Sequence, residues 1–85
     1  METIATRTVT LAATRYGYTG QIAWGKHGTL TAEVLQDIDD STFELVDGWT
    51  WEVRTAAGKV IGNGTETNKV RAARRAGNII ATLNA

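Results

Sequence analysis

Nine glycines and no proline punctuate this chain, and the spacing of the glycines limits its fold more than any other feature. They divide most of the sequence into short segments. The glycines that do so are Gly17, Gly20, Gly25, Gly28, Gly48, Gly58, Gly62 and Gly64. Short segments bounded at regular intervals by turn-forming residues are typical of a meander of β-hairpins. We therefore predict an antiparallel sheet over about residues 4–64.

Apolar and polar residues alternate within several segments, as they do in half-buried strands. Residues 5–15 are rich in Thr and Val, which favour strands, so they are predicted to form one strand. Further strands are predicted at residues 18–24, 29–35, 43–46, 49–54 and 60–64. Residues 47–48, Asp-Gly, are predicted to be a tight turn, and residues 56–59 a hairpin loop. Because Gly62 and Gly64 weaken the last strand, they indicate a sheet edge or a close backbone approach.

The final segment changes its apolar period from two residues to three and four. Its apolar stripe consists of Val70, Ala73, Gly77 and Ile80. This spacing predicts a helix over about residues 67–83, with Thr65 or Thr67 as its N-cap. Val70→Asp or Ile80→Asp is expected to unfold the protein, because each change would bury an unpaired charge.

Trp49, Trp51 and Val53 are spaced by two residues and therefore share one face of their strand. A chain of 85 residues without cysteine is stabilised by packing alone, and each buried Trp contributes on the order of 200 Å². We expect these three residues to pack beneath the helix. The predicted fold is one α+β domain over residues 1–85, a β-meander of four to six strands with one C-terminal helix packed on one face.

The composition argues against catalysis and against the common metal sites. One histidine and no cysteine exclude Cys–His catalysis and His-rich metal centres, and His27 is expected to be an exposed turn residue. Asp37, Asp39 and Asp40 lack the glycine and the closing glutamate of a calcium loop, so residues 36–42 are predicted to be a solvated acidic turn. Residues 58–64 do not match a phosphate-binding loop. We predict no enzymatic activity, no cofactor, no metal and no small-molecule substrate.

The net charge is zero, but the charges are segregated along the chain. Acidic residues dominate from Glu33 to Glu52, and basic residues from Arg54 to Arg75. Neutrality disfavours strong non-specific DNA binding but still allows a basic face along the predicted helix. An exposed aromatic patch is a second candidate interface, because such patches mark binding surfaces. The candidate partner-binding residues are Tyr16, Tyr18, Trp24, Arg71, Arg74 and Arg75.

No apolar run approaches the roughly 20 residues that a transmembrane helix needs. The first residues lack the basic segment followed by an apolar stretch that marks a signal peptide. We therefore expect no membrane association, a cytoplasmic location in a bacterial host cell, and a chain that is a whole small gene product.

The stretch WTWEVRTAAGKVIGNGTETNKVRAARRA, which begins at Trp49, resembles the C-terminal half of small uncharacterised proteins of actinobacterial bacteriophages. In those proteins Trp-x-Trp-x-Val, a Gly turn, a Gly-containing return strand and an Ala/Arg helix recur. The resemblance covers about residues 49–83. It implies a phage accessory protein, of a kind that inhibits or redirects a host protein, and it implies no catalytic residues.

The same stretch is also similar to the arm-binding N-terminal domain of phage integrases, a three-stranded sheet plus helix that reads DNA with the sheet. There a Trp strand leads through a Gly-Lys turn to a Thr-capped helix. This chain departs from that pattern at Thr65 and Glu66, where an aromatic residue is usual, and in its acidic residues before Asp47, where Arg and Lys are usual.

Three hypotheses follow for the function. The leading one is a non-enzymatic binding module, a small phage-encoded accessory protein that binds and modulates a host or phage protein. The first alternative is a small DNA-binding domain that uses the arginine flank of the helix or the open sheet. The second alternative is a homo-oligomeric virion component held by strand-edge or helix pairing.

Overall fold

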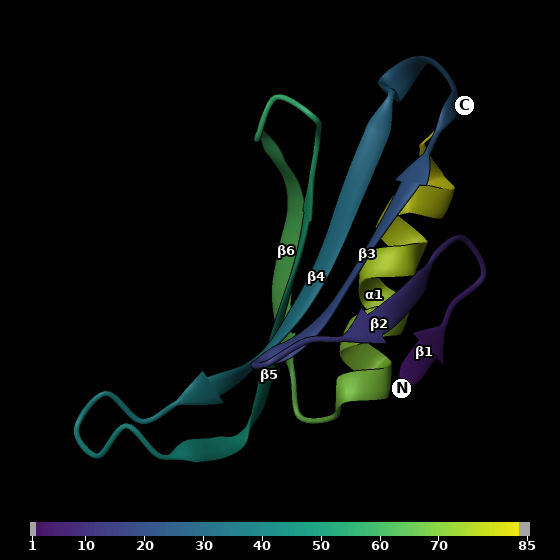
Figure 1. The fold of residues 1–85 in the computed structure, drawn as a ribbon. Helices are drawn as coiled ribbons and strands as arrows, with labels where there is room; N and C mark the ends of the chain where they lie inside the picture. Colours follow the sequence, from purple (N-terminus) through teal and green to yellow (C-terminus); the bar gives the residue numbers. More distant parts are fainter. Residues whose placement is uncertain (1, 84–85) are drawn as a thin grey trace.

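The meander predicted from the glycine spacing is present in the computed structural model, which describes residues 2–83 (Figure 1). Within those residues six strands form one sheet in the order β1-β2-β3-β4-β5-β6, and every neighbouring pair is antiparallel. The elements are β1 (Thr3–Ala5), β2 (Thr10–Ala13), β3 (Gly17–Ala23), the short 3-10 helix η1 (Gly25–His27), β4 (Thr29–Ile38), β5 (Leu45–Arg54), β6 (Val60–Glu66) and α1 (Lys69–Thr82). The predicted α+β fold with one C-terminal helix packed on the sheet is confirmed.

The single strand predicted at residues 5–15 is wrong, because a turn divides it into β1 and β2. The hydroxyl of Thr6 donates to the carbonyl oxygen of Val9 at 2.7 Å. The same oxygen accepts from the backbone N–H groups of Thr8 and Val9, at 3.3 and 3.0 Å. The Thr6 side chain therefore closes a turn inside a segment whose alternating Thr residues predict one continuous strand. It can do so because Ser and Thr hydroxyls compete with neighbouring strands for the hydrogen bonds of backbone groups.

The tight turn predicted at residues 47–48 is also wrong, because both residues lie within β5. The chain reverses at residues 39–44, where the Asp39 side chain accepts from the backbone N–H groups of Ser41 and Thr42, at 2.7 and 3.2 Å. Gly48 instead makes room across the hairpin. A Cβ atom there would lie 2.6 Å from a carboxylate oxygen of Asp37 on β4.

The N-cap of the helix is Asn68, one residue after Thr67, the later of the two predicted caps, and the helix begins at Lys69. The Asn68 side-chain oxygen accepts from the backbone N–H groups of Val70 and Arg71, at 2.8 and 3.3 Å. An amide oxygen at this position satisfies the same unpaired donors that a Thr hydroxyl would. Thr65 belongs to β6, so the predicted Thr caps are replaced.

The buried face of α1 is rotated relative to the predicted stripe. It consists of Ala72, Ala73, Ala76, Gly77 and Ile80. Val70 is 36% exposed, which corrects its assignment to the core. At 100° per residue Val70 lies about 90° from the centre of this face, and it stands in the first turn of the helix. Gly77 lies near the same edge of the face as Val70 but is covered, because the Thr8 hydroxyl donates to its carbonyl oxygen at 3.0 Å.

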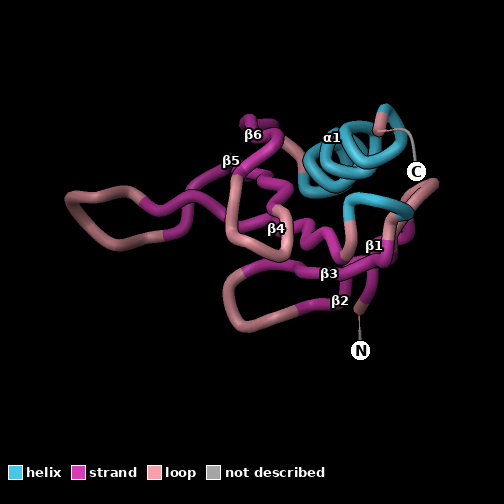
Figure 2. Tube along the Cα trace, turned by 90° about the horizontal axis from the view of Figure 1, so that it is seen from above, coloured by secondary structure: helices cyan, strands magenta, loops and turns pink. Residues whose placement is uncertain are grey.

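The sheet curves around α1 from β6 to β1, so that side chains from most of the meander reach the helix (Figure 2). The largest fully buried side chains are Leu11, Leu30, Val34, Val53 and Ile80. Trp51 is buried as predicted, whereas Trp49 is half-buried at the border of the core, with its ring centroid 6.3 Å from that of Tyr18.

The edge strand β6 needs its glycines for close packing. A Cβ atom at Gly64 would lie 2.8 to 3.0 Å from atoms of the Trp51 indole, and one at Gly62 would lie 3.0 Å from the Ile79 side chain. The predicted sheet edge is therefore confirmed. The close approach is made by side chains and not, as predicted, by another backbone segment. The glycines let the helix and the indole lie close to the edge of the sheet.

Ile80→Ala is expected to lower the free energy of unfolding by about 2–5 kcal/mol, because it leaves a cavity where the side chain is fully buried. Val70→Ala is the matched control and should change it by no more than about 0.5 kcal/mol. Urea unfolding followed by tryptophan fluorescence measures both values. Equal losses for the two variants would show that the helix is docked on a different face.

Candidate functional site

Two of the three aromatic residues predicted to form an exposed patch are instead wholly or partly buried and hydrogen-bonded within the protein. Tyr18 is buried, because it pairs with Val34, which in turn pairs with Trp51, on the core face of the sheet. Its hydroxyl donates to the Glu2 carboxylate. Trp24 is half-buried, and its indole N–H donates to the carbonyl oxygen of Leu83 at 3.1 Å. Only Tyr16 stays exposed, at 62%, with the Arg15 guanidinium 5.4 Å from its ring centroid. The predicted patch of three aromatics is therefore wrong.

Glu2, Tyr18 and Lys69 form a polar cluster that joins the beginning of the described chain to the beginning of α1. The Lys69 ammonium donates to Glu2 at 2.7 Å and to the Tyr18 hydroxyl oxygen at 3.0 Å. The hydrogen bond from Lys69, and then that from Tyr18, holds the pKa of the Glu2 carboxyl below its ordinary value. The hydrogen bond to Glu2 likewise raises the pKa of Lys69. The three polar groups are hydrogen-bonded to one another, so the cluster links the beginning of the described chain to α1.

The most exposed apolar surface lies on the far end of the β4–β5 hairpin, residues 37–47, which we call the arm. The arm projects beyond the part of the sheet that α1 covers (Figures 1 and 2). Phe43 at its tip is 82% exposed and Leu45 is 60% exposed. Ile38 and Val46 are also exposed. The arm therefore carries large apolar side chains with no packing of their own.

Hydrogen bonds hold the arm in shape without covering these side chains. The Asp39 N–H donates to the Glu44 carbonyl oxygen at 2.8 Å, and the Phe43 N–H donates to the Asp39 carbonyl oxygen at 2.7 Å. At the base of the arm the Thr50 hydroxyl donates to Asp37 at 2.7 Å. The pairing register shifts between Gln36 and Ile38, and such irregularities increase local twist. The arm is thus a formed hairpin that bends away from the core.

One face of the arm continues onto the body of the protein. Ile38 and Leu45 are direct partners across the hairpin, so their side chains share a face. A shallow cavity of about 270 Å³ at the base of the arm is lined by Tyr16, Leu45 and Trp49, among others. We define the arm surface as Tyr16, Ile38, Phe43 and Leu45. Of these, sequence reasoning found only Tyr16. Phe43 and Leu45 were predicted to lie in a short strand, and Ile38 in the acidic turn at residues 36–42, whereas the structure continues β4 to Ile38.

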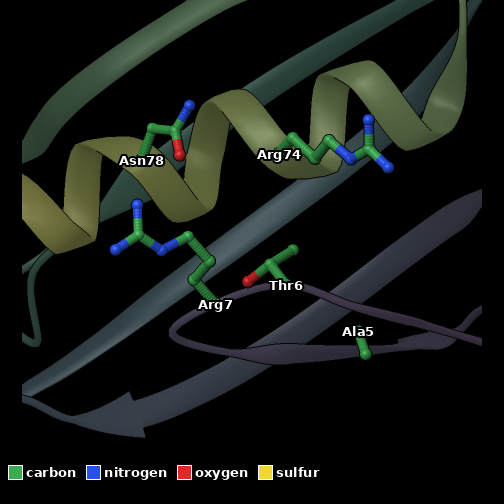
Figure 3. A pocket seen from close by; sticks show the side chains of 5 residues that line it. All are labelled: Ala5, Thr6, Arg7, Arg74 and Asn78. Atoms are coloured by element: carbon green, nitrogen blue, oxygen red, sulfur yellow. The ribbon is translucent and has the colours of Figure 1, made fainter.

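A second surface is basic and lies between α1 and the β1–β2 turn. A cavity of about 420 Å³ there is lined by Ala5, Thr6, Arg7, Arg74 and Asn78. Figure 3 shows Arg7 reaching from the turn toward Asn78, with Arg74 about one turn earlier on the helix. We call this the arginine cavity. Sequence reasoning missed Arg7, because only the packing of the turn against Gly77 brings it to the helix.

The predicted arginine flank is brought together as expected, although its members differ in their surroundings. Arg71, Arg74 and Arg75 line a neighbouring cavity of about 230 Å³ with Asn78 and Glu66. Arg75 pairs with Glu66 at 3.7 Å. Within residues 2–83 neither Arg71 nor Arg74 forms an ion pair. The basic surface therefore keeps uncompensated positive charge.

The arm has the opposite charge, and it too is uncompensated. Its sequence contains five carboxylates and no Lys, Arg or His. They are Asp37, Asp39, Asp40, Glu44 and Asp47. None of them takes part in an ion pair in the described part of the chain. The molecule therefore has an acidic, apolar arm and a basic flank on α1, and the two adjoin at the base of the arm, where Asp37, Asp47 and Arg71 line one cavity.

Three further findings bear on the function. Among the described residues no three His, Cys, Asp or Glu side chains are grouped so that they could hold a metal ion. Residues 2–83 include no helix with the length and the apolar character that a bilayer crossing requires. Comparisons with protein-family models, curated proteins and solved structures found no match.

The polar cluster predicts a pH-dependent stability. Because the folded-state pKa of Glu2 lies below its ordinary value of 4.5, its contribution is present above that pH and is lost as the pH falls through the folded-state pKa. The raised pKa of Lys69 sets the upper limit of the pH range in which the pair stabilises the fold. The contribution of Lys69 to stability is complete below the ordinary Lys value of 10.5 and is lost as the pH rises through the folded-state pKa. Glu2→Gln should therefore be less stable than wild type by a constant amount from about pH 6 to 9, and this gap should narrow as the pH falls below 4.5.

Urea unfolding at each pH measures the gap. Glu44→Gln is the control, because it changes an exposed carboxylate that forms no ion pair with residues 2–83, and it should leave the free energy of unfolding unchanged near neutral pH. A gap for Glu2→Gln that does not narrow as the pH falls below 4.5, or that is absent at pH 7, would contradict a tether through the ionised carboxylate.

Proposed function

We propose that this chain is a non-catalytic protein-binding module that holds its partner with the arm surface. The observation that carries the proposal is the 82% exposure of Phe43 at the tip of a hydrogen-bonded hairpin. Aromatic anchors of this kind supply much of the binding energy in protein interfaces. Burying Phe43 and Leu45 in a partner would contribute about 1.5–3 kcal/mol for each side chain.

The charge of the arm indicates the chemistry of the partner. The apolar side chains are surrounded by carboxylates, including Asp40 and Glu44 on either side of the tip. Complementary charge at the rim of an interface speeds association and rejects wrong partners. The partner surface that fits is therefore an apolar groove with Lys or Arg side chains at its rim.

The biological setting is proposed from the resemblance of residues 49–83 to small proteins of actinobacterial bacteriophages. That resemblance supports a phage accessory protein that binds and modulates a host or phage protein. The arm supports the same proposal, because a preformed hairpin pays little ordering entropy when it docks. The modulation then consists of occupying a groove on the partner.

The double variant Phe43→Ser/Leu45→Ser should weaken binding to the partner by at least about 100-fold, because two apolar anchors are lost. The protein is immobilised, proteins retained from a bacterial host lysate are identified, and the affinity is measured with the purified pair. The thermal unfolding midpoint should not fall, since neither side chain is packed in the core.

Val60→Ser is the matched control, because Val60 is an apolar residue that is 43% exposed on β6, outside the arm. It should bind like wild type. Binding that survives the double variant, or that is lost on Val60→Ser, would reject the arm as the binding surface.

A further inference from the structure

The two charged surfaces of this molecule are complementary to each other. The acidic tip of the arm surrounds an exposed aromatic ring, and the arginine cavity offers an opening between two cationic side chains, Arg7 and Arg74. Neither charge is compensated by an ion pair within residues 2–83. The arginine cavity therefore resembles the partner surface proposed for the arm, a groove with Lys or Arg side chains at its rim.

The tip of the arm does not reach the arginine cavity of its own copy. The arm projects from one end of the sheet, whereas the β1–β2 turn, which carries Arg7, lies toward the other end (Figures 1 and 2). The longest dimension of the molecule is 43 Å, several times the distance of about 8 Å over which charges are screened at physiological salt. Contact between the tip of the arm and the arginine cavity thus requires a second molecule.

The arginine cavity is large enough for the Phe43 ring at the tip of the arm. Its volume of about 420 Å³ falls within the range of about 300–1,000 Å³ for sites that enclose whole small molecules. A single phenyl ring is smaller than such ligands. Entry of Phe43 would bring Asp40 and Glu44 to the mouth of the cavity, where Arg7 and Arg74 lie.

We infer that, when no other partner is bound, the arm of one copy docks in the arginine cavity of a second copy, and that the exchange is reciprocal. A two-fold pair forms the same contact twice and leaves neither surface free. Specific interfaces bury about 1,200–2,000 Å² in total, so each of the two contacts has to supply only about half of that. The inference rests on the proposed function, because it names a second copy as the protein that the arm binds in the absence of its target.

The test uses two charge-reversal variants of the full chain. One is Asp40→Lys/Glu44→Lys on the arm, which leaves the Asp39 side chain that shapes the turn in place. The other is Arg7→Glu/Arg74→Glu in the cavity. Each variant alone places like charges opposite each other and should associate about 100-fold more weakly than wild type. Size-exclusion chromatography with light scattering over a range of concentrations measures the association.

An equimolar mixture of the two variants separates this inference from every other mode of self-association. In the mixture each arm meets a cavity of opposite charge, so the two variants should form a one-to-one heterodimer with an affinity near that of the wild-type dimer. Lys26→Glu/Lys59→Glu changes two exposed lysines outside both surfaces and should dimerise like wild type. Circular dichroism melting confirms that each variant is folded.

Three outcomes would overturn the inference. They are a wild-type protein that is monomeric at every concentration, a dimer that persists in both charge-reversal variants, and a mixture that fails to form heterodimers. A monomer whose Arg7 and Arg74 instead bind a DNA duplex in a salt-dependent way would also overturn it, since the cavity would then serve phosphate. Each of these results leaves the proposed function standing, because that is judged by the loss of target binding on Phe43→Ser/Leu45→Ser.

Discussion

The close approach of α1 to the curved sheet is the interaction on which the other features of the molecule depend. Its buried face is made mostly of Ala and Gly, so the helix axis lies close to the strands. Gly77 admits the Thr6 side chain, to which a Cβ atom would come within 2.9 Å or less, and Gly64 on β6 admits the Trp51 indole. Small residues on both sides let a chain of 85 residues fill a core without disulfides.

The same approach creates the basic surface. Because the β1–β2 turn packs against Gly77, Arg7 is carried to the flank of α1 that already holds Arg74. A helix that stood further from the sheet would leave these two side chains on unrelated surfaces. The arm is the converse case: β4 and β5 are buried where the helix covers them, and their far ends carry similar apolar side chains with nothing to cover them.

The sequence predicted the architecture because its glycines and its alternation act over short distances. The hairpin at residues 56–59, the edge position of β6 and the presence of a terminal helix all follow from local pattern. The exact positions of turns and caps could not be predicted, because neighbouring residues of similar chemistry could each have formed them. Thr6 takes a turn where another Thr of the same segment would continue a strand, and Asn68 caps the helix in place of Thr67. Asp47-Gly48 resembles a turn because the reason for Gly48 lies across the hairpin, at Asp37.

The surfaces were less predictable than the fold for a physical reason. Tyr18 and Trp24 are covered by segments distant in the sequence, Tyr18 by Glu2 and Lys69 and Trp24 by Leu83, and local pattern does not reveal such contacts. The arginine flank followed from helical spacing alone, but Phe43 and Leu45 could be recognised as exposed only once the turn was placed at residues 39–44.

Native-state hydrogen exchange followed by NMR tests the division into a docked body and an unpacked arm most directly. The account predicts that the amides of Val53 in β5 and Ile80 in α1 open with one free energy, equal to that of global unfolding. The hydrogen-bonded amides of Asp39 and Phe43 should open at a lower free energy, because nothing packs over the arm. A helix that opens independently of the sheet, or arm amides as well protected as those of Val53, would contradict it.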